Sequence, residues 1–432
     1  MPGPFAVSTA LHAFNSFGRG PYQYGSKLFC FAFSDYQNIQ AFVSEDDGVT
    51  WTATGGAKTI SSSVNALGGC KSLDGQSVYV LYVSGSFVVQ RLKVSRFDMN
   101  SGTFVDDSSD GPILNSGAGN SPVLCIEQST DTTLVILTKT FRSGSQSTAS
   151  ITTLDEALGS WDTLHDPAGQ TGSLLFLGVG LVRGASDRVH GFVVETDGSD
   201  QRLLHVLAYG SGGGIGSAFS EIVPEIMQGF PNVSAAAAGA SIAVAYNSPD
   251  VGIGSPQAIS VAIATDADNP SWTTTVADAA TVGTEDGSQV ALIGGDSLRL
   301  VYRPVGGDVL FSIYNGASWN LPESLFSPNL NAVYIEGKQI TDGLGVLFAD
   351  TDFSTDAVSS YFQVPGGAQI NGSAGIPSEE AFGKTHGVFG GGSPETCGAP
   401  VHIPPAVPCQ QIPVTPAYPG DQDGCPTRGY SL

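Results

Sequence analysis

The feature that most constrains this chain is a regular series of aromatic residues, each of which follows a turn built from small or polar residues. Such periodic units are typical of a β-propeller, in which each blade is a four-stranded antiparallel sheet. A repeat architecture also lets one domain grow by adding units, so 432 residues need not be divided among several domains. Six members of the series lie 53, 57, 58, 53 and 47 residues apart: Trp51, Phe104, Trp161, Phe219, Trp272 and Trp319.

The segments between these anchors read as short strands in a constant order. In the second unit they cover residues 62–69, 77–83 and 87–97, followed by a strand that starts at Thr103. The content of 56 Gly and 25 Pro, with only 13% charged residues, suits a chain of short strands and many turns. The only helical candidate is a short segment at 378–384. The later units repeat the order at 122–127 and 133–138, 174–182 and 189–195, 233–238 and 241–246, and 289–293 and 297–302.

The last unit lacks one strand. After Trp319 come strand patterns near 332–336, 343–348 and 358–364, but no fourth. Phe5 lies 46 residues before Trp51, so residues 3–8 can supply the missing outer strand. Pairing the two ends of the domain in one blade would leave no unpaired edge. We therefore predict an all-β fold over residues 1–365, a seven-bladed β-propeller closed by the N-terminal strand. Six blades, a tandem of β-sandwiches and a β-helix are the alternatives.

Residues 366–432 form a Pro/Gly/Cys-rich segment in which the strand pattern stops. We expect an extended tail, because such a composition cannot bury a core. Cys397, Cys409 and Cys425 are candidates for disulfides there, and their odd number leaves one thiol for a bridge to the propeller or to another chain. Reduced thiols are the alternative. The other three cysteines, Cys30, Cys70 and Cys125, lie in strand patterns and are expected to be small core residues.

The strongest local motif spans residues 44–51, where the sequence fits Ser/Thr-x-Asp-x-Gly-x-Thr/Ser-Trp at every specified position. This pattern predicts a tight hairpin in which Ser and Asp side chains bind backbone N–H groups, Gly takes a left-handed conformation and Trp packs beneath the turn. The structural residues are Ser44, Asp46, Gly48, Thr50 and Trp51.

Degraded copies of this motif occur at 265–272 and 312–319. In the former, Asn269 stands where Gly belongs and is expected to take the same left-handed conformation. In the latter, Tyr314 replaces Asp.

This motif is the Asp-box, or BNR repeat, and through it the chain resembles the sialidase-like propeller superfamily. The resemblance implies the fold, because in that superfamily the motif is structural and lies away from the catalytic centre. A sialidase would add an arginine triad, a Tyr nucleophile activated by Glu, an Asp acid/base and an Arg-Ile-Pro signature before the first Asp-box. Only Arg19 precedes the box here, and it lacks that signature. Arg303, in Tyr-Arg-Pro, resembles the signature superficially but lies in the sixth unit.

No other pattern identifies a catalytic residue, a metal ligand or a cofactor site. The carboxylates considered for a two-carboxylate glycosidase are most simply residues of solvated turns: Glu195, Glu221, Glu225, Glu285 and Asp286. The six histidines show no metal-ligand spacing, and no nucleotide-binding fingerprint is present. We therefore assign no catalytic residue, no metal and no cofactor.

The net charge of −23 argues against nucleic acid as a partner. No apolar run is long enough for membrane insertion, and the N-terminus lacks the basic and apolar regions of a signal peptide. Together with the degraded Asp-boxes and the Cys-bearing tail, these features favour a non-enzymatic structural or binding propeller. We interpret it as a surface protein of a virion, such as a phage tail or decoration protein.

In this interpretation the tail binds neighbouring virion subunits, a host-surface glycan is a possible ligand, and the protein is extracellular without a signal peptide. The alternatives are a sialidase-like glycoside hydrolase and a cytoplasmic location.

Overall fold

The computed structural model describes most of residues 5–365, and the chain divides into two compact units, 1–374 and 375–432. The description leaves out 1–4, 9–14, 17–18, 36, 61–65, 87–88, 115–122, 131–132, 142–146, 171–177, 197–200, 211, 227–232, 249–257, 279–289, 305–306, 327–331, 342, 351–357 and 366–432. The helical candidate at 378–384 and the expected tail therefore lie outside the described residues.

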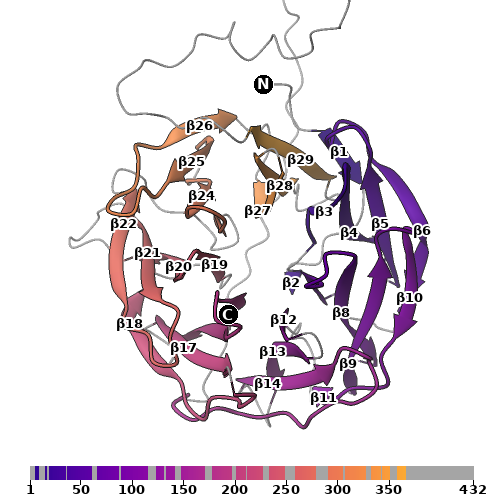
Figure 1. Ribbon diagram of the computed structural model, residues 1–432, viewed down its shortest axis with the longest axis horizontal. Helices are drawn as coiled ribbons and strands as arrows, with labels where there is room; N and C mark the ends of the chain where they lie inside the picture. The colour runs from indigo at the N-terminus through magenta and orange to yellow at the C-terminus, as the bar shows by residue number, and fades with distance from the viewer. Residues whose placement is uncertain are drawn as a thin grey trace, which may run out of the picture. The chain divides into compact units, whose positions relative to one another are not determined.

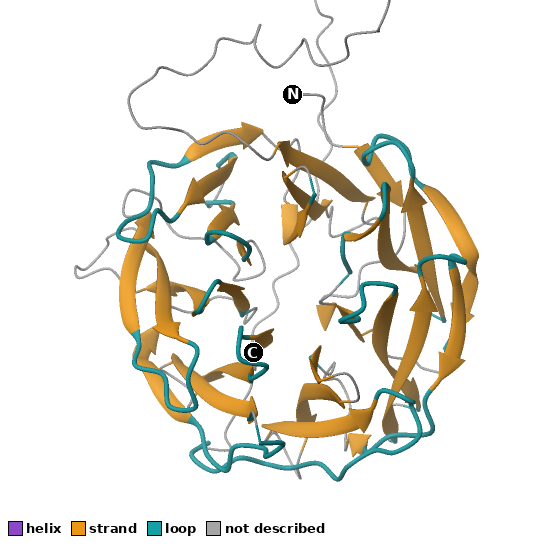
Figure 2. Ribbon diagram, in the orientation of Figure 1, coloured by secondary structure: helices purple, strands orange, loops and turns teal. Residues whose placement is uncertain are grey.

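Within those limits the secondary structure is strand, turn and loop (Figure 2). No helix among the described residues has the length and apolar character needed to cross a membrane.

The described strands form seven sheets, which we number in chain order from the one that holds the intact Asp-box. The first consists of β3 (Tyr22–Tyr24), β4 (Lys27–Asp35), β5 (Asn38–Ser44) and β6 (Thr52–Thr59). The second contains β7 (Ala66–Lys71), β8 (Ser77–Gly85), β9 (Gln90–Asp98) and β10 (Thr103–Asp107), with β2 (Asn15–Ser16) and β11 (Ile113–Leu114) added at its edges. The third contains β12 (Leu124–Thr130), β13 (Thr133–Phe141) and β14 (Ser147–Asp155).

The later sheets have four strands each. The fourth has β15 (Gly178–Arg183), β16 (Val189–Thr196), β17 (Gln201–Tyr209) and β18 (Ser220–Ile226). The fifth has β19 (Ser234–Ala238), β20 (Ser241–Ser248), β21 (Ala258–Thr265) and β22 (Thr273–Asp278). The sixth has β23 (Val290–Ile293), β24 (Arg299–Tyr302), β25 (Val309–Ile313) and β26 (Glu323–Phe326). The seventh has β27 (Ala332–Ile340), β28 (Gly343–Asp350), β29 (Val358–Pro365) and β1 (Phe5–Ser8).

The first strands of successive sheets, from β7 through β12, β15, β19 and β23 to β27 and β3, lie next to one another around a common centre (Figure 1). Within each sheet the consecutive strands pair antiparallel, as hairpins that lead outward from this centre. This all-β arrangement of antiparallel sheets is that of a β-propeller. The prediction of the fold class is confirmed at this level.

The third sheet departs from the predicted pattern. Trp161 is one of the predicted anchors, but the segment around it makes only isolated bridges, from Trp161 to Leu154 and from His165 to Ile151. Pro167 follows at once and has no N–H to donate, so it prevents the segment from extending its pairing. The second sheet instead has an additional strand at its inner edge, because β2 pairs with β7 in parallel.

The N-terminal strand lies where the sequence places it. β1 pairs antiparallel with β29, with Phe5 opposite Tyr361 and Ala6 opposite Ser360. The backbone of residues 5–8 thus occupies the outer position of the seventh sheet. The side chain of Phe5 lies outside the description, so its role as an anchor stays a prediction.

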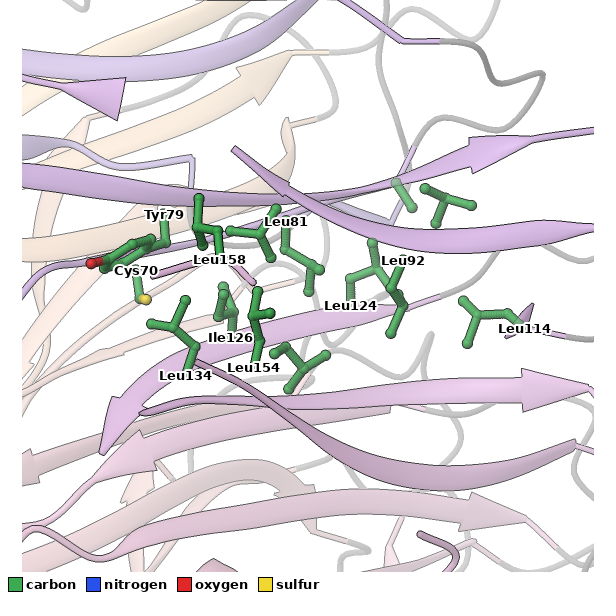
Figure 3. Packing of buried hydrophobic residues seen from close by; sticks show 14 residues of the cluster. Cys70, Tyr79, Leu81, Leu92, Leu114, Leu124, Ile126, Leu134, Leu154 and Leu158 are labelled. Atoms are coloured by element: carbon green, nitrogen blue, oxygen red, sulfur yellow. The ribbon is translucent and has the colours of Figure 1, made fainter. Parts of the chain in front are cut away.

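Large apolar clusters fill the spaces between neighbouring sheets. Figure 3 shows the one between the second and third sheets, where Leu81 and Leu92 from one sheet meet Leu124, Ile126 and Leu134 from the other. A Cβ atom on Gly68 of β7 would lie 3.2 Å from the carbonyl oxygen of Leu124, so the absence of a side chain there permits the two inner strands to approach. This packing fixes β12, the strand that carries the residue most important for the site.

Candidate functional site

The Asp-box of residues 44–51 is a turn held by its own side chains. Asp46 accepts hydrogen bonds from the backbone N–H of Thr50 at 2.8 Å and from its hydroxyl at 2.6 Å. The Ser44 hydroxyl accepts from the N–H of Gly48 at 2.8 Å, and Gly48 has a φ of 86°. Trp51 packs against an apolar cluster of the first and seventh sheets and donates to the Gly48 carbonyl at 2.9 Å. The bonds to Thr50 lower the pKa of Asp46.

The copy at 312–319 replaces these bonds with others. Asn315, rather than the residue at the Asp position, accepts from the N–H groups of Ala317 at 3.0 Å and Ser318 at 2.9 Å. Tyr314 packs against Trp319 with ring centroids 5.3 Å apart. Trp319 donates to the Thr275 hydroxyl of the fifth sheet at 3.0 Å, so this turn is tied to its neighbour.

The copy at 265–272 corrects one expectation. Apart from glycines, the described residues with positive φ are Asp47, Leu158 and Asp187, so Asn269 does not take the left-handed conformation. Pro270 follows Asn269 and restricts its backbone to extended conformations. The side chain of Asp266 turns away from its own hairpin and accepts from the N–H of Ser186 in the fourth sheet at 2.7 Å.

The remaining anchors are packing residues. Phe104 packs edge-on against Phe97 at 5.2 Å, and Phe219 is partly buried against the core of the third and fourth sheets. Trp161 donates to the carbonyl of Ser109, in the loop between β10 and β11, at 3.2 Å. Cys30, Cys70 and Cys125 are buried free thiols, whereas Cys397, Cys409 and Cys425 lie outside the described residues. None of these positions gathers reactive groups, so the candidate site lies elsewhere.

Charged side chains instead lie on several of the innermost strands. On β12, Leu124 and Ile126 face the second sheet, whereas Cys125 faces the fourth. Because side chains alternate along a strand, Glu127 shares the face of Cys125. By the same alternation Arg183 of β15 shares the face of Val179, which packs in the cluster that holds Cys125. Glu127 and Arg183 therefore face the same interface, at its inner edge.

The seventh sheet contributes two more charges from β27. Glu336 accepts from the backbone N–H groups of Arg19 at 3.0 Å and Gly20 at 3.3 Å, and the Arg19 guanidinium lies 4.0 Å from it. Lys338 lies two residues further on and is half-buried. We call Glu127, Arg183, Glu336, Lys338 and Arg19 the central cluster.

The electrostatics of the central cluster single out Glu127. Burial raises the pKa of the Glu127 carboxyl, and Lys338 and Arg183 partly offset this effect. Its side chain accepts one hydrogen bond, from the N–H of Gln128 at 3.1 Å. Within the described part of the chain, neither Lys338 nor Arg183 forms an ion pair, although both are near enough to act on Glu127. Their charges are therefore not neutralised by an ion pair with a described residue.

This arrangement has a definite chemical capability. A carboxyl group whose pKa is raised stays protonated at higher pH and can act as a general acid. Two cations next to it would bind a carboxylate or a sulfate group of a ligand. No group of side chains able to hold a metal ion occurs among the described residues.

A sialidase-type set is only partly matched. The centre holds two arginines, Arg19 and Arg183, with Lys338 as a further cation. Tyr22, the tyrosine near this cluster, is only 3% exposed and packs against Phe31, and burial followed by Glu336 raises its pKa. A tyrosine held in this way is not presented to a substrate.

The residues weighed from sequence that the structure describes do not belong to the central cluster. Arg303 donates to the Gly307 carbonyl at 3.0 Å. Glu195 is buried and forms an ion pair of 2.5 Å with Arg202, which also pairs with the more exposed Glu221 at 3.4 Å. The side chain of Glu225, and residues 285–286, lie outside the description.

Sequence reasoning missed Glu127, Arg183, Glu336 and Lys338. A usable signal was present, since each is a charged residue inside a strand pattern that begins a repeat and is otherwise apolar or small. In a propeller the first strand of each repeat lines the centre, so charges on several first strands converge even though they are far apart in sequence. Testing each carboxylate singly could not reveal that convergence.

Comparison with known proteins gives a fold but no family. Neither a protein-family model nor the sequence of a curated protein matches the chain. Among solved structures, the polysaccharide lyase Uly1 aligns with a TM-score of 0.50 and 10% identity over 84% of this chain and 99% of the lyase. At this identity the likeness shows the fold alone.

Two other similar structures fall below that score. The α-L-arabinofuranosidase Arb93A from Fusarium graminearum gives a TM-score of 0.49 and 11% identity, over 83% of this chain and 97% of that one. The β-propeller domain of the Trilobed protease from Pyrococcus furiosus gives 0.44 and 10%, over 84% and 96%.

Proposed function

We propose that this protein is a carbohydrate-active propeller that binds an anionic polysaccharide at the central cluster and cleaves it there. The observation that carries the proposal is the partly buried carboxyl of Glu127, whose pKa is raised, beside two cations on other sheets that have no ion pair in the described structure. Polysaccharide is also the substrate class named for the lyase Uly1, whose fold this chain shares.

The roles follow from the charges. Arg183 and Lys338 would bind the carboxylate of a uronate unit, which brings the adjoining glycosidic oxygen close to Glu127. Burial raises the pKa of Glu127, so its protonated form would donate the proton to that oxygen as the bond to the sugar carbon breaks. In hydrolysis a water molecule adds to that carbon and gives up a proton to solvent, whereas in elimination the uronate loses its C5 proton to solvent. Arg19 would hold Glu336 in place as a positioning residue.

The test is a panel of anionic polysaccharides (polygalacturonate, alginate and hyaluronan) with neutral arabinan and dextran as controls. New reducing ends report cleavage, and ultraviolet absorbance of an unsaturated uronate distinguishes elimination from hydrolysis. We expect Glu127→Gln to abolish cleavage of the substrate and the exposed Glu323→Gln to retain it. No cleavage and no binding on the whole panel, or full activity in Glu127→Gln, would contradict the proposal.

A second candidate is a propeller that binds such a glycan without cleaving it. This second candidate is favoured because Glu336 is already held by backbone hydrogen bonds from Arg19 and Gly20. Glu127 is then the one carboxyl of the cluster that is free to transfer a proton. This reading accords with a virion attachment protein whose residues 366–432 bind a neighbouring subunit. Binding that survives in Glu127→Gln, with no cleavage by the wild type, would select it.

We also propose that the propeller has seven blades and that β1 closes the ring. The pairing of β1 with β29 and the seven sheets support this proposal. Deletion of residues 1–8 should expose the edge of β29 and lower the melting temperature by several degrees, since roughly 1–3 kcal/mol is expected from the loss of one paired strand. An unchanged melting temperature would argue against closure.

A further inference from the structure

A chain of four side chains crosses the interface between the fourth and fifth sheets. His190 Nε2 lies 3.0 Å from an oxygen of Asp266, and His190 Nδ1 lies 3.0 Å from His205 Nε2. His205 Nδ1 lies 3.5 Å from the hydroxyl of Ser220. Both imidazoles are almost completely buried, whereas Ser220 is exposed on β18. The chain therefore runs from solvent to a buried carboxylate.

The hydrogen-bond partners assign the tautomers. Asp266 has a lowered pKa and, as a carboxylate, can only accept, so His190 must carry its proton on Nε2. The Nδ1 of a neutral His190 is then an acceptor, and His205 must donate to it from Nε2. The Nδ1 of His205 remains as an acceptor, which the Ser220 hydroxyl reaches at 3.5 Å as an alternative to the His205 carbonyl at 3.4 Å. With both histidines neutral, every bond of the chain has one donor and one acceptor.

Charged and aromatic neighbours hold this chain in place. Arg188, in the turn before β16, lies 3.8 Å from Asp266 and 2.5 Å from Asp268. Asp266 also accepts from the N–H of Ser186. His205 packs against Trp272 at 5.4 Å, so the fifth sheet covers the pair on a second side.

At acid pH the four side chains cannot keep this pattern of hydrogen bonds. One added proton can reside on Nδ1 of His190 only if the proton of His205 moves from Nε2 to Nδ1, where the Ser220 hydroxyl can accept it. A second cannot, because N–H groups of two positive rings would then face each other across 3.0 Å. Burial lowers the pKa of His190 despite Asp266, and burial with the neighbouring His190 lowers the pKa of His205 to about 3.

We propose that the Asp266–His190–His205–Ser220 chain is an acid-sensitive lock that joins the fourth sheet to the turn of residues 266–272 and releases it as the pH falls. The sign follows from linkage, because the folded chain holds its histidines neutral while the unfolded chain protonates them at an ordinary pKa of about 6.5. The lock contributes its full stability above a pH of about 6.5. It loses that stability progressively as the pH falls toward 3, the folded pKa of His205.

Hydrogen exchange of the full chain between neutral and acid pH tests the lock. We expect peptides covering β17 and the turn of residues 266–272 to lose protection at a higher pH than peptides of the first sheet. His205→Phe retains a ring between Phe192 and Trp272 but removes one titrating group, so it should shift that loss by about one pH unit toward acid. His165→Phe, at an exposed histidine of the third sheet, is the matched control and should leave the profile unchanged.

Nitrogen NMR of the histidine rings in the wild type decides the matter if His205→Phe does not fold. Nε2–H tautomers for His190 and His205, with no titration near pH 6.5 while the fold persists, support the lock. Free titration of both rings near the ordinary value of about 6.5 without loss of structure would overturn it, as would simultaneous loss of protection in all sheets.

Discussion

The central cluster and the histidine chain both bury charged or titratable groups at an interface between sheets, but they complete their interactions differently. In the histidine chain, Asp266 accepts from a histidine and a backbone N–H, and each ring has a partner. In the central cluster, Arg183 and Lys338 act on Glu127 from other sheets without pairing with any described residue. A satisfied network stabilises the fold, whereas cations without an ion pair near a protonatable carboxyl are the feature on which the proposed function rests.

The largest effect that would sharpen this comparison is on activity. Arg183→Gln or Lys338→Gln should lower kcat/KM on a uronate polysaccharide by about 100-fold, since each removes a charge that binds the substrate carboxylate. The melting temperature should change little, because neither side chain has an ion-pair partner in the described structure to lose. Steady-state kinetics with a parallel thermal melt checks both parts. A large loss of stability with retained activity would reverse the assignment.

The next effect is on stability. Asp266→Ala should lower the free energy of unfolding by about 2–4 kcal/mol, because it leaves His190 Nε2 buried without an acceptor and removes the acceptor of the Ser186 N–H. Cleavage at the central cluster should persist below the new melting temperature. Urea denaturation measures the first quantity. The account fails here if Asp266→Ala is as stable as the wild type at neutral pH.

A smaller effect concerns the sign of stability changes with pH. The pKa of Glu127 is raised in the folded chain, so stability falls as the pH rises above the ordinary carboxyl pKa of about 4.3 and levels off above the folded pKa. Glu127→Gln should therefore raise the melting temperature slightly at pH about 8 but not at pH about 4. Asp46 has a lowered pKa, so Asp46→Asn should do the opposite and destabilise the protein near neutral pH. Thermal melts at the two pH values compare them directly. The same change of melting temperature with pH in Glu127→Gln and Asp46→Asn would contradict this expectation.

The sequence predicts the fold well because its signals are local. The turn of residues 44–51 specifies its own hydrogen bonds, and the period of the anchors places most strands within a few residues of those observed. Predictions whose outcome depends on neighbouring residues are less accurate. Asn269 could take the conformation of a glycine but is prevented by Pro270, and the segment after Trp161 makes bridges rather than a strand.

The spacing of the sequence does not predict the candidate site, because its members come from different repeats and share only their place in a first strand. Glu127, Arg183 and Lys338 belong to the third, fourth and seventh sheets, and nothing in the spacing of the sequence connects them. The same holds for the pairing of His190 with Asp266, which are 76 residues apart. A metal-ligand spacing does not reveal the partners of His190 and His205, because these are another imidazole ring and a carboxylate.

Cleavage of a uronate polysaccharide by the full chain, measured for the wild type, Glu127→Gln and Glu323→Gln over a range of pH, tests the central claim most directly. The account predicts that wild-type activity declines as the pH rises through the raised pKa of Glu127, because the general acid is then ionised. It predicts a loss of about 100-fold or more in Glu127→Gln and none in Glu323→Gln. Cleavage that is equal in all three proteins would contradict it.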